Sequence, residues 1–369
     1  MAQTCYAIAM QQIAVIGAGI AGLTVALRRA DAGDRVVIFE ASSVVGGQLR
    51  SERQGGFVIE HGAEGFVARS EVVPNLAASA GIAEQVVDQL EQRSFLFDGR
   101  GLVELAPGEA GRLLGFQVPN DNLGRGIRSF QHGMAQLPEQ LAERLGPRVE
   151  LRLDRAVIRV LPEPDHVSVL DALGTHYRFD AVVIATTARS AAALLSEAFA
   201  GPALALRDSA LVSSLTVSLA YGPGAIRHPL DGTGFIVPSP EELAGVRAVT
   251  FSSSKLPGRA PEGHALLRLF FRPSDADLSE LSDAEWSLRA ERALAQTLPV
   301  SAPAQRAYVS RWPSALPVFD EAHRARVSAL EAALSNAGIW LAGAAFHGSG
   351  IDAAIRSAEH TARAIANRP

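Results

Sequence analysis

Two reactive side chains are almost missing from this 369-residue sequence, which contains one cysteine, Cys5, and one lysine, Lys255. A single cysteine excludes an internal disulfide and any metal or iron–sulfur site built from several thiolates. The nine histidines are scattered without metal-ligand spacing, so we expect no bound metal. Because almost every basic residue is an arginine, an isolated arginine is a weak functional signal in this chain.

Long apolar runs are missing as well, and none reaches the roughly 20 residues that a membrane-spanning helix needs. The N-terminal sequence MAQTCYAIAMQQ lacks the basic start and apolar stretch of a secretion signal. A net charge of −5 argues against nucleic acid as the main partner. With 48% hydrophobic and 20% charged residues, the composition is that of an ordinary globular protein. We therefore expect a cytoplasmic enzyme that acts on a small molecule.

A dinucleotide-binding unit is predicted near the start of the chain. An apolar segment at residues 13–16 leads into a G-x-G-x-x-G turn and then into a helical segment. The three glycines are Gly17, Gly19 and Gly22, which allow the tight turn, the approach of a pyrophosphate and the packing of helix on strand. A second apolar strand ends at Glu40, 18 residues after the last glycine, where a carboxylate binds ribose hydroxyls and disfavours NADP.

Two further glycine-rich segments indicate which dinucleotide is bound. The pair Gly46-Gly47 lets the backbone run beside an extended FAD, with an ordinary glycine turn as the alternative. Near the C-terminus, Gly343, Gly348 and Gly350 precede a helix whose dipole would favour negative charge on a reduced flavin, with a simple capped helix as the alternative. No second G-x-G-x-x-G is present for a pyridine nucleotide. We therefore predict FAD, reoxidised by oxygen or another acceptor.

The order of the expected elements indicates an α/β fold with two domains. The apolar run at 181–185 is typical of a central parallel strand, whereas residues 214–271 alternate as in an antiparallel sheet with one buried face. A last strand and helix, 339–342 and 351–366, return to the parallel sheet. We predict a Rossmann-like FAD-binding domain with an inserted α+β substrate domain. The predicted FAD-binding domain comprises residues 1–92, 140–205 and 305–369, and the substrate domain residues 93–139 and 206–304.

Several longer segments of the sequence indicate a protein family. They include FVIEHGAEGFVAR (57–69), FLFDGRGLVELAPG (95–108), SFQHGMAQLPEQLAERLG (129–146), SSLTVSLAY (213–221) and WLAGAAFHGSGIDAAI (340–355). In collinear order, they resemble the protoporphyrinogen/coproporphyrinogen oxidase family of the FAD-dependent amine-oxidase-like superfamily. The resemblance implies hydride transfer from a porphyrinogen, protoporphyrinogen IX or coproporphyrinogen III, to flavin N5 in haem biosynthesis, with O2 as acceptor.

The resemblance also implies roles for single residues. Those expected to bind FAD are Gly17, Gly19, Ile20, Ala21, Gly22, Glu40, Gly46, Gly47, Gln48, Ser51, Val157, Trp312, Gly343, Gly350 and Ile351. Arg93 matches an arginine that pairs with a substrate propionate, with a solvated surface charge as the alternative. No catalytic acid–base pair is expected, because orienting the substrate against the flavin suffices. His61 and His347 are interpreted as structural, with a proton carrier as the alternative, and Lys255 as unlike the lysine of amine oxidases.

The substrate half departs from the family pattern. Only residues 109–132 join the hairpin to the next helix, too few for the family's helical, membrane-associated segment. The family's Pro-Asp-Cys-Ile is Asp352-Ala353-Ala354-Ile355 here, and its Gly-Gly-Arg is Gly46-Gly47-Gln48. We therefore expect a shortened member with a more open pocket, which a homodimer or a partner protein would complete. Two alternatives stay open: an FAD-dependent oxidase or desaturase of another small molecule, such as an amine or polyene, and a non-catalytic flavin-binding remnant.

Overall fold

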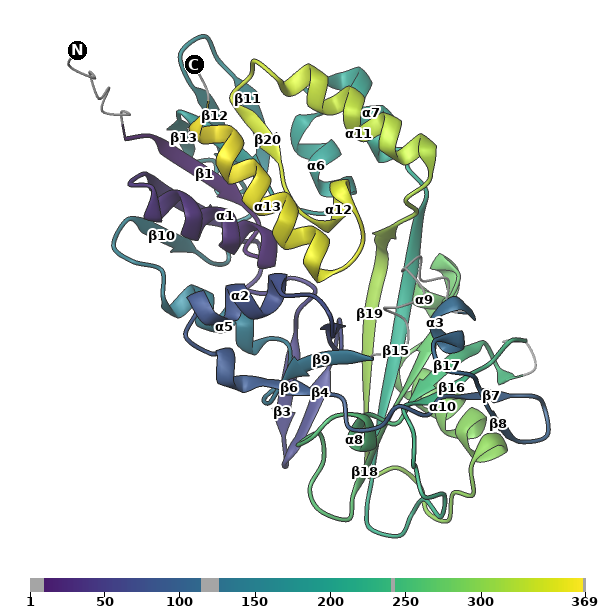
Figure 1. Ribbon diagram of the computed structural model, residues 1–369. Coiled ribbons are helices and arrows are strands. Elements are labelled where there is room, and N and C mark those ends of the chain that lie inside the picture. Colours follow the sequence, from purple (N-terminus) through teal and green to yellow (C-terminus); the bar gives the residue numbers. More distant parts are fainter. Residues whose placement is uncertain (1–9, 114–125, 240–242, 368–369) are drawn as a thin grey trace. The chain divides into compact units, whose positions relative to one another are not determined.

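The computed structural model describes residues 10–113, 126–239 and 243–367 (Figure 1). Cys5 and residues 114–125 of the predicted short connection lie outside the described residues. The chain divides into two compact units. Unit 1 comprises Met1–Gly47, Pro138–Ala210 and Pro317–Pro369, and unit 2 comprises Gln48–Leu137 and Leu211–Leu316.

Unit 1 is built on a five-stranded sheet in the order β10-β2-β1-β14-β20, with every pairing parallel. Its strands are β1 (Gln12–Ile16), β2 (Arg35–Phe39), β10 (Val149–Arg152), β14 (Ala181–Ile184) and β20 (Ile339–Leu341). Two helices, α1 (Ile20–Asp31) and α13 (Ile351–Ala366), pack against each other beside β1 (Figure 1). All four residues of β14 are buried, as expected for a strand covered on both faces.

A second layer of unit 1 is a three-stranded antiparallel sheet, β11 (Val157–Pro162), β12 (Val167–Asp171) and β13 (His176–Phe179). The remaining helices of unit 1 are α6 (Ala188–Leu195), α7 (Ala200–Arg207), α11 (Glu321–Leu334) and α12 (Ala344–His347). Apolar side chains from both sheets and from these helices form one hydrophobic core of unit 1. Helix α5 (Gln136–Glu143) contains the boundary between the units.

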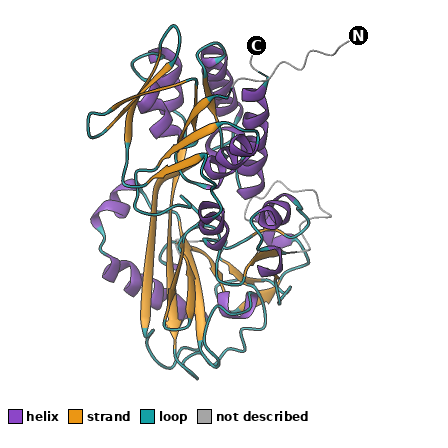
Figure 2. Cartoon of the chain, turned by 90° about the vertical axis from the view of Figure 1, so that its left-hand side faces the viewer, coloured by secondary structure: helices purple, strands orange, loops and turns teal. Residues whose placement is uncertain are grey.

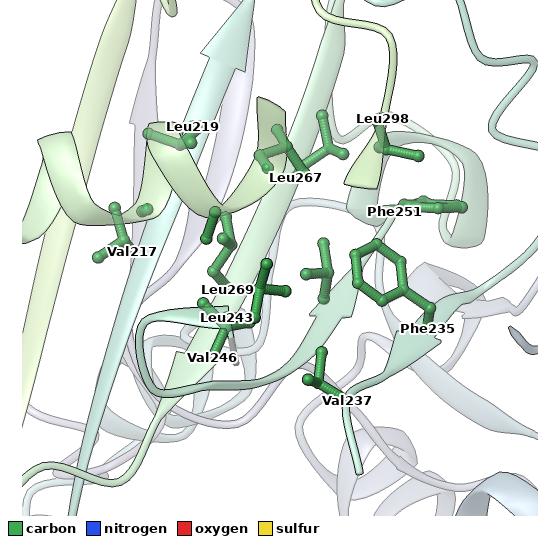
Figure 3. Packing of buried hydrophobic residues seen from close by; sticks show 14 of the residues in the cluster. Val217, Leu219, Phe235, Val237, Leu243, Val246, Phe251, Leu267, Leu269 and Leu298 are labelled. Atoms are coloured by element: carbon green, nitrogen blue, oxygen red, sulfur yellow. The ribbon is translucent and has the colours of Figure 1, made fainter. Parts of the chain in front are cut away.

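Unit 2 is built on a seven-stranded sheet in the order β19-β15-β18-β17-β16-β7-β8. These strands are β7 (Phe95–Phe97), β8 (Leu102–Glu104), β15 (Leu211–Tyr221), β16 (Gly234–Ile236), β17 (Val246–Thr250), β18 (Ala265–Phe271) and β19 (Arg306–Pro317). The long strands β15 and β19 are prominent orange arrows in Figure 2. Alternate residues such as Val217, Leu219, Leu267 and Leu269 form a core on one face (Figure 3). Trp286 of α10 (Asp283–Thr297) belongs to the same core.

The other face of this sheet is covered by a hairpin, β3 (Ser51–Gln54) and β4 (Phe57–Glu60). Phe57 and Ile59 of β4 pack on Ala220 and Leu266 of the sheet. This contact groups the hairpin with unit 2, whereas the predicted boundaries placed residues 48–92 in the FAD-binding domain. The predicted boundaries also placed residues 305–316 there, but they form most of β19, a strand of the seven-stranded sheet.

The rest of unit 2 is a small sheet with short helices. The sheet consists of β5 (Phe66–Val67), β9 (Ile127–Phe130) and β6 (Val86–Asp88), and the helices are α2 (Val72–Ser79), η1 (Ala83–Gln85), α3 (Glu109–Leu113), α8 (Ser252–Lys255) and α9 (Asp275–Glu280). Within the part of the chain that the structure describes, no helix has the length and apolar character needed to cross a membrane. The predicted fold class, a parallel nucleotide-binding sheet with an antiparallel second unit, is confirmed.

Candidate active site

The predicted G-x-G-x-x-G turn joins β1 to α1. Gly17 has a φ of +104°, and a Cβ there would lie 2.6 Å from the carbonyl oxygen of Ala185. A Cβ on Gly22 would lie 1.9 Å from the carbonyl oxygen of Gly17, so neither position accepts a larger residue. At Gly19, no described atom lies within 4 Å of an added Cβ. Backbone atoms therefore crowd the turn at Gly17 and Gly22, whereas the space at Gly19 is open. A pyrophosphate needs access to the backbone at that position.

The first turn of α1 is suited to binding an anion. Gly19 is the N-cap, no side chain among the described residues caps this end, and the first turn has no acidic residue. Ile20 and Ala21 are 8% and 6% exposed, so they would act through their backbone N–H groups. Unpaired N–H groups and the positive end of the helix dipole favour a phosphate at such a terminus.

Gly46 and Gly47 lie directly beside this turn. The N–H of Gly46 donates to the carbonyl oxygen of Ala18 at 2.9 Å, and Gly46 forms an isolated bridge with Gly19. Gly47 has a φ of +56°, and a Cβ there would lie 3.4 Å from the Cα of Gly19. The structure thus brings both predicted glycine segments together on the open side of the turn.

Glu40 follows β2, and its carboxylate is held from two sides. Oε2 accepts a hydrogen bond from the N–H of Ala18 at 2.8 Å, and Oε1 accepts bonds from the N–H and the hydroxyl of Ser42, both at 2.9 Å. A carboxylate accepts about four hydrogen bonds, so one position remains for a ribose hydroxyl. Val157 lies at the start of β11 and packs against the core of unit 1.

Glycines with positive φ also shape the segment between β20 and α13. The φ values are +116° at Gly343, +128° at Gly348 and +95° at Gly350. A Cβ on Gly343 would lie 3.3 Å from the Cβ of Ala21, so this segment lies against the first turn of α1. Gly350 is the N-cap of α13, whose first residue, Ile351, is 9% exposed. Three distant parts of the chain therefore meet at the carboxyl ends of β1, β2 and β20, where such sheets bind nucleotides.

Two more predicted cofactor residues, Gln48 and Ser51, belong to unit 2. The hydroxyl of Ser51 donates to Oε2 of Glu60 at 2.7 Å and accepts from the N–H of Ala135 at 3.0 Å. The side-chain amide of Gln48 donates to the carbonyl oxygen of Ala315 at 3.3 Å. Both side chains are thus engaged within unit 2, which leaves chiefly their backbone groups for a ligand.

His61 is a centre of hydrogen bonding in unit 2. Its carbonyl oxygen accepts from Nε1 of Trp312 at 2.7 Å and from Nη2 of Arg268 at 3.3 Å. Its ring nitrogens contact the hydroxyl of Ser310 at 2.7 Å and Oε2 of Glu52 at 3.1 Å. These contacts agree with a structural interpretation of His61, and they fix the indole of Trp312, a predicted flavin neighbour.

Arg93, the predicted substrate residue, stands just before β7 and has a half-exposed side chain, 46% accessible. Its Nε and Nη2 donate to Oε2 of Glu104 at 3.1 and 2.9 Å, and its Nη1 donates to Oδ2 of Asp231 at 2.5 Å. The hydrogen bonds that Arg93 donates to Glu104, with the charges of both carboxylates, raise the pKa of Arg93 above its ordinary value. A substrate carboxylate would therefore meet a permanently charged guanidinium that is already oriented by two acids.

The sequence did not predict a cluster of buried charges in unit 2. Glu64 accepts bonds from the hydroxyl of Ser252 at 2.7 Å and from Nζ of Lys255 at 3.0 Å. Burial alone would raise the pKa of Glu64, but the charges of Lys255 and Arg268 and these two hydrogen bonds hold that pKa below its ordinary value. Lys255 is thus ion-paired, which does not favour the role of the lysine in amine oxidases.

Glu60 is the second acid of this cluster. It is 4% exposed, and Nη2 of Arg259 lies 3.6 Å from its Oε1. Burial raises the pKa of Glu60, although Arg259 and hydrogen bonds from Ser51 and Met134 act in the opposite direction. The only sequence signal for the cluster was an arginine inside an apolar strand, Arg268 in ALLRLFF, which the general excess of arginine obscured.

Comparisons of the sequence with known proteins agree with the predicted resemblance. The chain is 22% identical to coproporphyrinogen III oxidase of Bacillus subtilis, covering 92% of this chain and 95% of that protein. It is also 22% identical to coproporphyrinogen III oxidase of Staphylococcus aureus, covering 87% and 91%. The first alignment spans 449 positions, so this 369-residue chain lacks residues at many of them, as predicted for a shortened member.

Solved structures show the same fold. One, from Exiguobacterium sp. 255-15 and provisionally named a protoporphyrinogen oxidase, has a TM-score of 0.82 at 21% identity and covers 97% of this chain and 99% of that chain. A triple mutant of putrescine oxidase has a TM-score of 0.75 at 17% identity and covers 98% and 99%. The sequence matches the family described as flavin containing amine oxidoreductase over residues 20–118 and 108–366, which identifies the cofactor as FAD. The chain belongs to the flavin-containing amine oxidoreductase family.

Proposed function

We propose that this protein is an FAD-dependent porphyrinogen oxidase that removes hydrides from coproporphyrinogen III or protoporphyrinogen IX and uses O2 as the final acceptor, as a step of haem biosynthesis. The observation that carries the proposal is the match to coproporphyrinogen III oxidases over nearly the whole length of both chains. Coproporphyrinogen III is the first substrate to test, because those relatives are named for it.

The cofactor residues in this proposal follow from the fit of unit 1 to FAD. The pyrophosphate would bind the first turn of α1 at Gly19, and Glu40 would accept hydrogen bonds from the adenosine ribose. Val157 would place its backbone against the adenine. Bound FAD supplies the hydride acceptor. The uncapped terminus of α13 at Gly350 would lie near the flavin, where its dipole favours negative charge.

The remaining predicted residues complete the FAD site in the proposal. Ile20, Ala21 and Gly22 would offer backbone to the phosphates, and Gly17 would maintain the turn. The other proposed contacts are Gly46, Gly47, Gln48, Ser51, Trp312, Gly343 and Ile351.

On the substrate side, we propose that Arg93 binds a propionate of the tetrapyrrole. The guanidinium is half exposed, and it carries five N–H donors, of which the two neighbouring acids use three. A propionate would pair with the remaining donors or displace Asp231, whose Oδ2 accepts a hydrogen bond from Nη1 of Arg93. The protein's part in the reaction is then to orient the ring system and to bind its carboxylates.

The test begins with purified protein loaded with FAD. Porphyrinogens prepared without oxygen are added in air, and the rise in porphyrin fluorescence is compared with that of the same protein stripped of FAD. A rate above the stripped control supports the proposal, and formation of H2O2 identifies O2 as the acceptor. If the yellow, FAD-loaded protein oxidises neither porphyrinogen faster than autoxidation does, the proposed substrate is wrong. Flavin bleaching by an amine or polyene would instead support the oxidase or desaturase alternative.

A further inference from the structure

Three helices of unit 1 meet in a chain of hydrogen bonds that ends on the glycine segment after β20. Oε1 of Glu331, on α11, lies 2.7 Å from Nε2 of His347, the last residue of α12. Nδ1 of His347 lies 2.6 Å from the hydroxyl of Ser357, on α13. The same hydroxyl accepts the N–H of Gly343 at 2.9 Å. These bonds connect α11, α12 and α13, which are labelled in Figure 1, with the loop that begins at Gly343.

One assignment of donors and acceptors satisfies all three bonds. The N–H of Gly343 can only donate, so the oxygen of Ser357 is its acceptor and the hydroxyl proton is available for Nδ1 of His347. Nε2 of His347 then carries the ring proton and donates it to Glu331, which as a carboxylate only accepts. With the ring proton on Nε2, each bond in this series pairs one donor with one acceptor, and each bond supports the next.

Helix α12 is only Ala344–His347, and glycines with positive φ stand at both of its ends, so the position of this segment depends on contacts with its neighbours. One of these contacts is the side chain of Phe346, which is 3% exposed in the core of unit 1. A second bond to the segment comes from Nε2 of His323, on α11, which contacts the carbonyl oxygen of Ala345 at 3.0 Å. The side chains of Ser357 and the two histidines therefore supply polar contacts that hold this short segment together with the packing of Phe346.

Gly343 lies against the first turn of α1, so its position affects the space beside the dinucleotide turn. A Cβ on Gly343 would lie 3.3 Å from the Cβ of Ala21, in the first turn of α1. A shift of the segment by a few tenths of an ångström would therefore change the space beside the dinucleotide turn. Ser357 is 6% exposed and lies on the inner side of α13, so it acts on this space without offering a surface to a ligand.

We propose that Ser357 and His347 are positioning residues for the cofactor: they fix the segment from Gly343 to Gly348 against α1 and thereby set the affinity and the reduction potential of the flavin. The proposal rests on the FAD site proposed above. The two can fail separately, because a wild-type protein that does not bind FAD refutes the site, whereas variants that bind FAD like the wild type refute only the positioning role.

The test compares two buried hydroxyls of the same helix. Ser357→Ala removes the bond to Gly343, and alanine is favourable in a helix, so the variant should fold. Thr361→Val is the matched control, because Thr361 is 3% exposed and donates to the carbonyl oxygen of Leu341 in β20 at 2.9 Å, outside the segment. Ser357→Thr keeps the hydroxyl and should restore the wild-type properties.

The measurements are the dissociation constant of FAD by flavin fluorescence, the midpoint potential by dye equilibration, and Tm. Ser357→Ala should weaken FAD binding by about 5–10-fold, the effect of one buried hydrogen bond, and shift the potential. His347→Gln should give a smaller change of the same sign. Thr361→Val should lower Tm but leave affinity and potential within about twofold of wild type. The proposal would be overturned if Ser357→Ala had the FAD affinity and midpoint potential of the wild type, or if Thr361→Val changed both quantities as much as Ser357→Ala does. If His347→Gln had the affinity and potential of the wild type, His347 would have no positioning role.

Discussion

Replacing Lys255 with methionine should destabilise unit 2, because it leaves the carboxylate of Glu64 buried without its closest cation. The two side chains are 15% and 9% exposed, and Nζ lies 3.0 Å from Oε2. Breaking a buried ion pair from one side costs about 3–5 kcal/mol, and we expect the lower end because Arg268 still acts on Glu64. For a unit of this size, a loss of about 3 kcal/mol corresponds to a fall in Tm of roughly 6–12 °C.

The effect should depend on pH in one direction. The pKa of Glu64 lies below its ordinary value in the folded protein, so its ionised form adds stability above the pKa of the unfolded chain. That contribution disappears as the pH falls through the lowered folded pKa. The difference between wild type and Lys255→Met should therefore be largest near neutral pH and shrink in acid.

A double-mutant cycle with Glu64→Gln completes the experiment. Urea unfolding of the wild type, both single variants and the double variant should give a coupling of more than about 1 kcal/mol, as for residues in direct contact. Lys255 is the only lysine, so 13C-methylation labels one side chain, whose resonance should move in Glu64→Gln. A loss under about 1 kcal/mol in Lys255→Met, the range of an exposed pair, would refute the reasoning.

Three further predictions concern the site. Glu40→Gln should weaken FAD binding by about 10–100-fold in a fluorescence titration, because the charged acceptor of the Ala18 N–H is lost; unchanged affinity would contradict its role. Gly22→Ala should lower Tm strongly, since its Cβ would lie 1.9 Å from the carbonyl oxygen of Gly17, and a variant with wild-type Tm would show that the turn relaxes freely. Arg93→Met should raise KM for the porphyrinogen by about 10-fold or more while FAD stays bound; loss of flavin instead would make Arg93 a cofactor residue.

The local parts of the fold could be predicted because neighbouring residues encode them. In the glycine turn, Gly22 faces the backbone of Gly17 only five positions away, and the apolar run at 181–185 is explained by burial on both faces of β14. The N-terminal half of the site follows the same logic, since Gly46 pairs with Gly19 only 27 positions away. Such short-range patterns are the ones that periodicity and turn chemistry reveal.

The unit boundary and the buried charges depend on residues that are far apart in the sequence. Phe57 contributes to unit 2 through contact with Leu266, and nothing in either local pattern indicates that partner. Arg268 occupies an apolar strand because its guanidinium reaches the carbonyl oxygen of Gly62 at 2.7 Å, a contact across 206 positions. Arginine is common in this sequence, and most arginines are expected to be exposed. The composition therefore did not indicate that Arg268 is buried.

The return of the chain to the parallel sheet has a consequence for biosynthesis. The dinucleotide turn is synthesised more than 300 residues before β20, the Gly343 segment and α13, which packs on α1. A nascent chain therefore carries the phosphate-binding turn without the helix that covers it. We therefore expect stable insertion of the flavin only after residues 339–366 have been synthesised, and a ribosome stalled before residue 339 should hold a chain that retains the cofactor poorly.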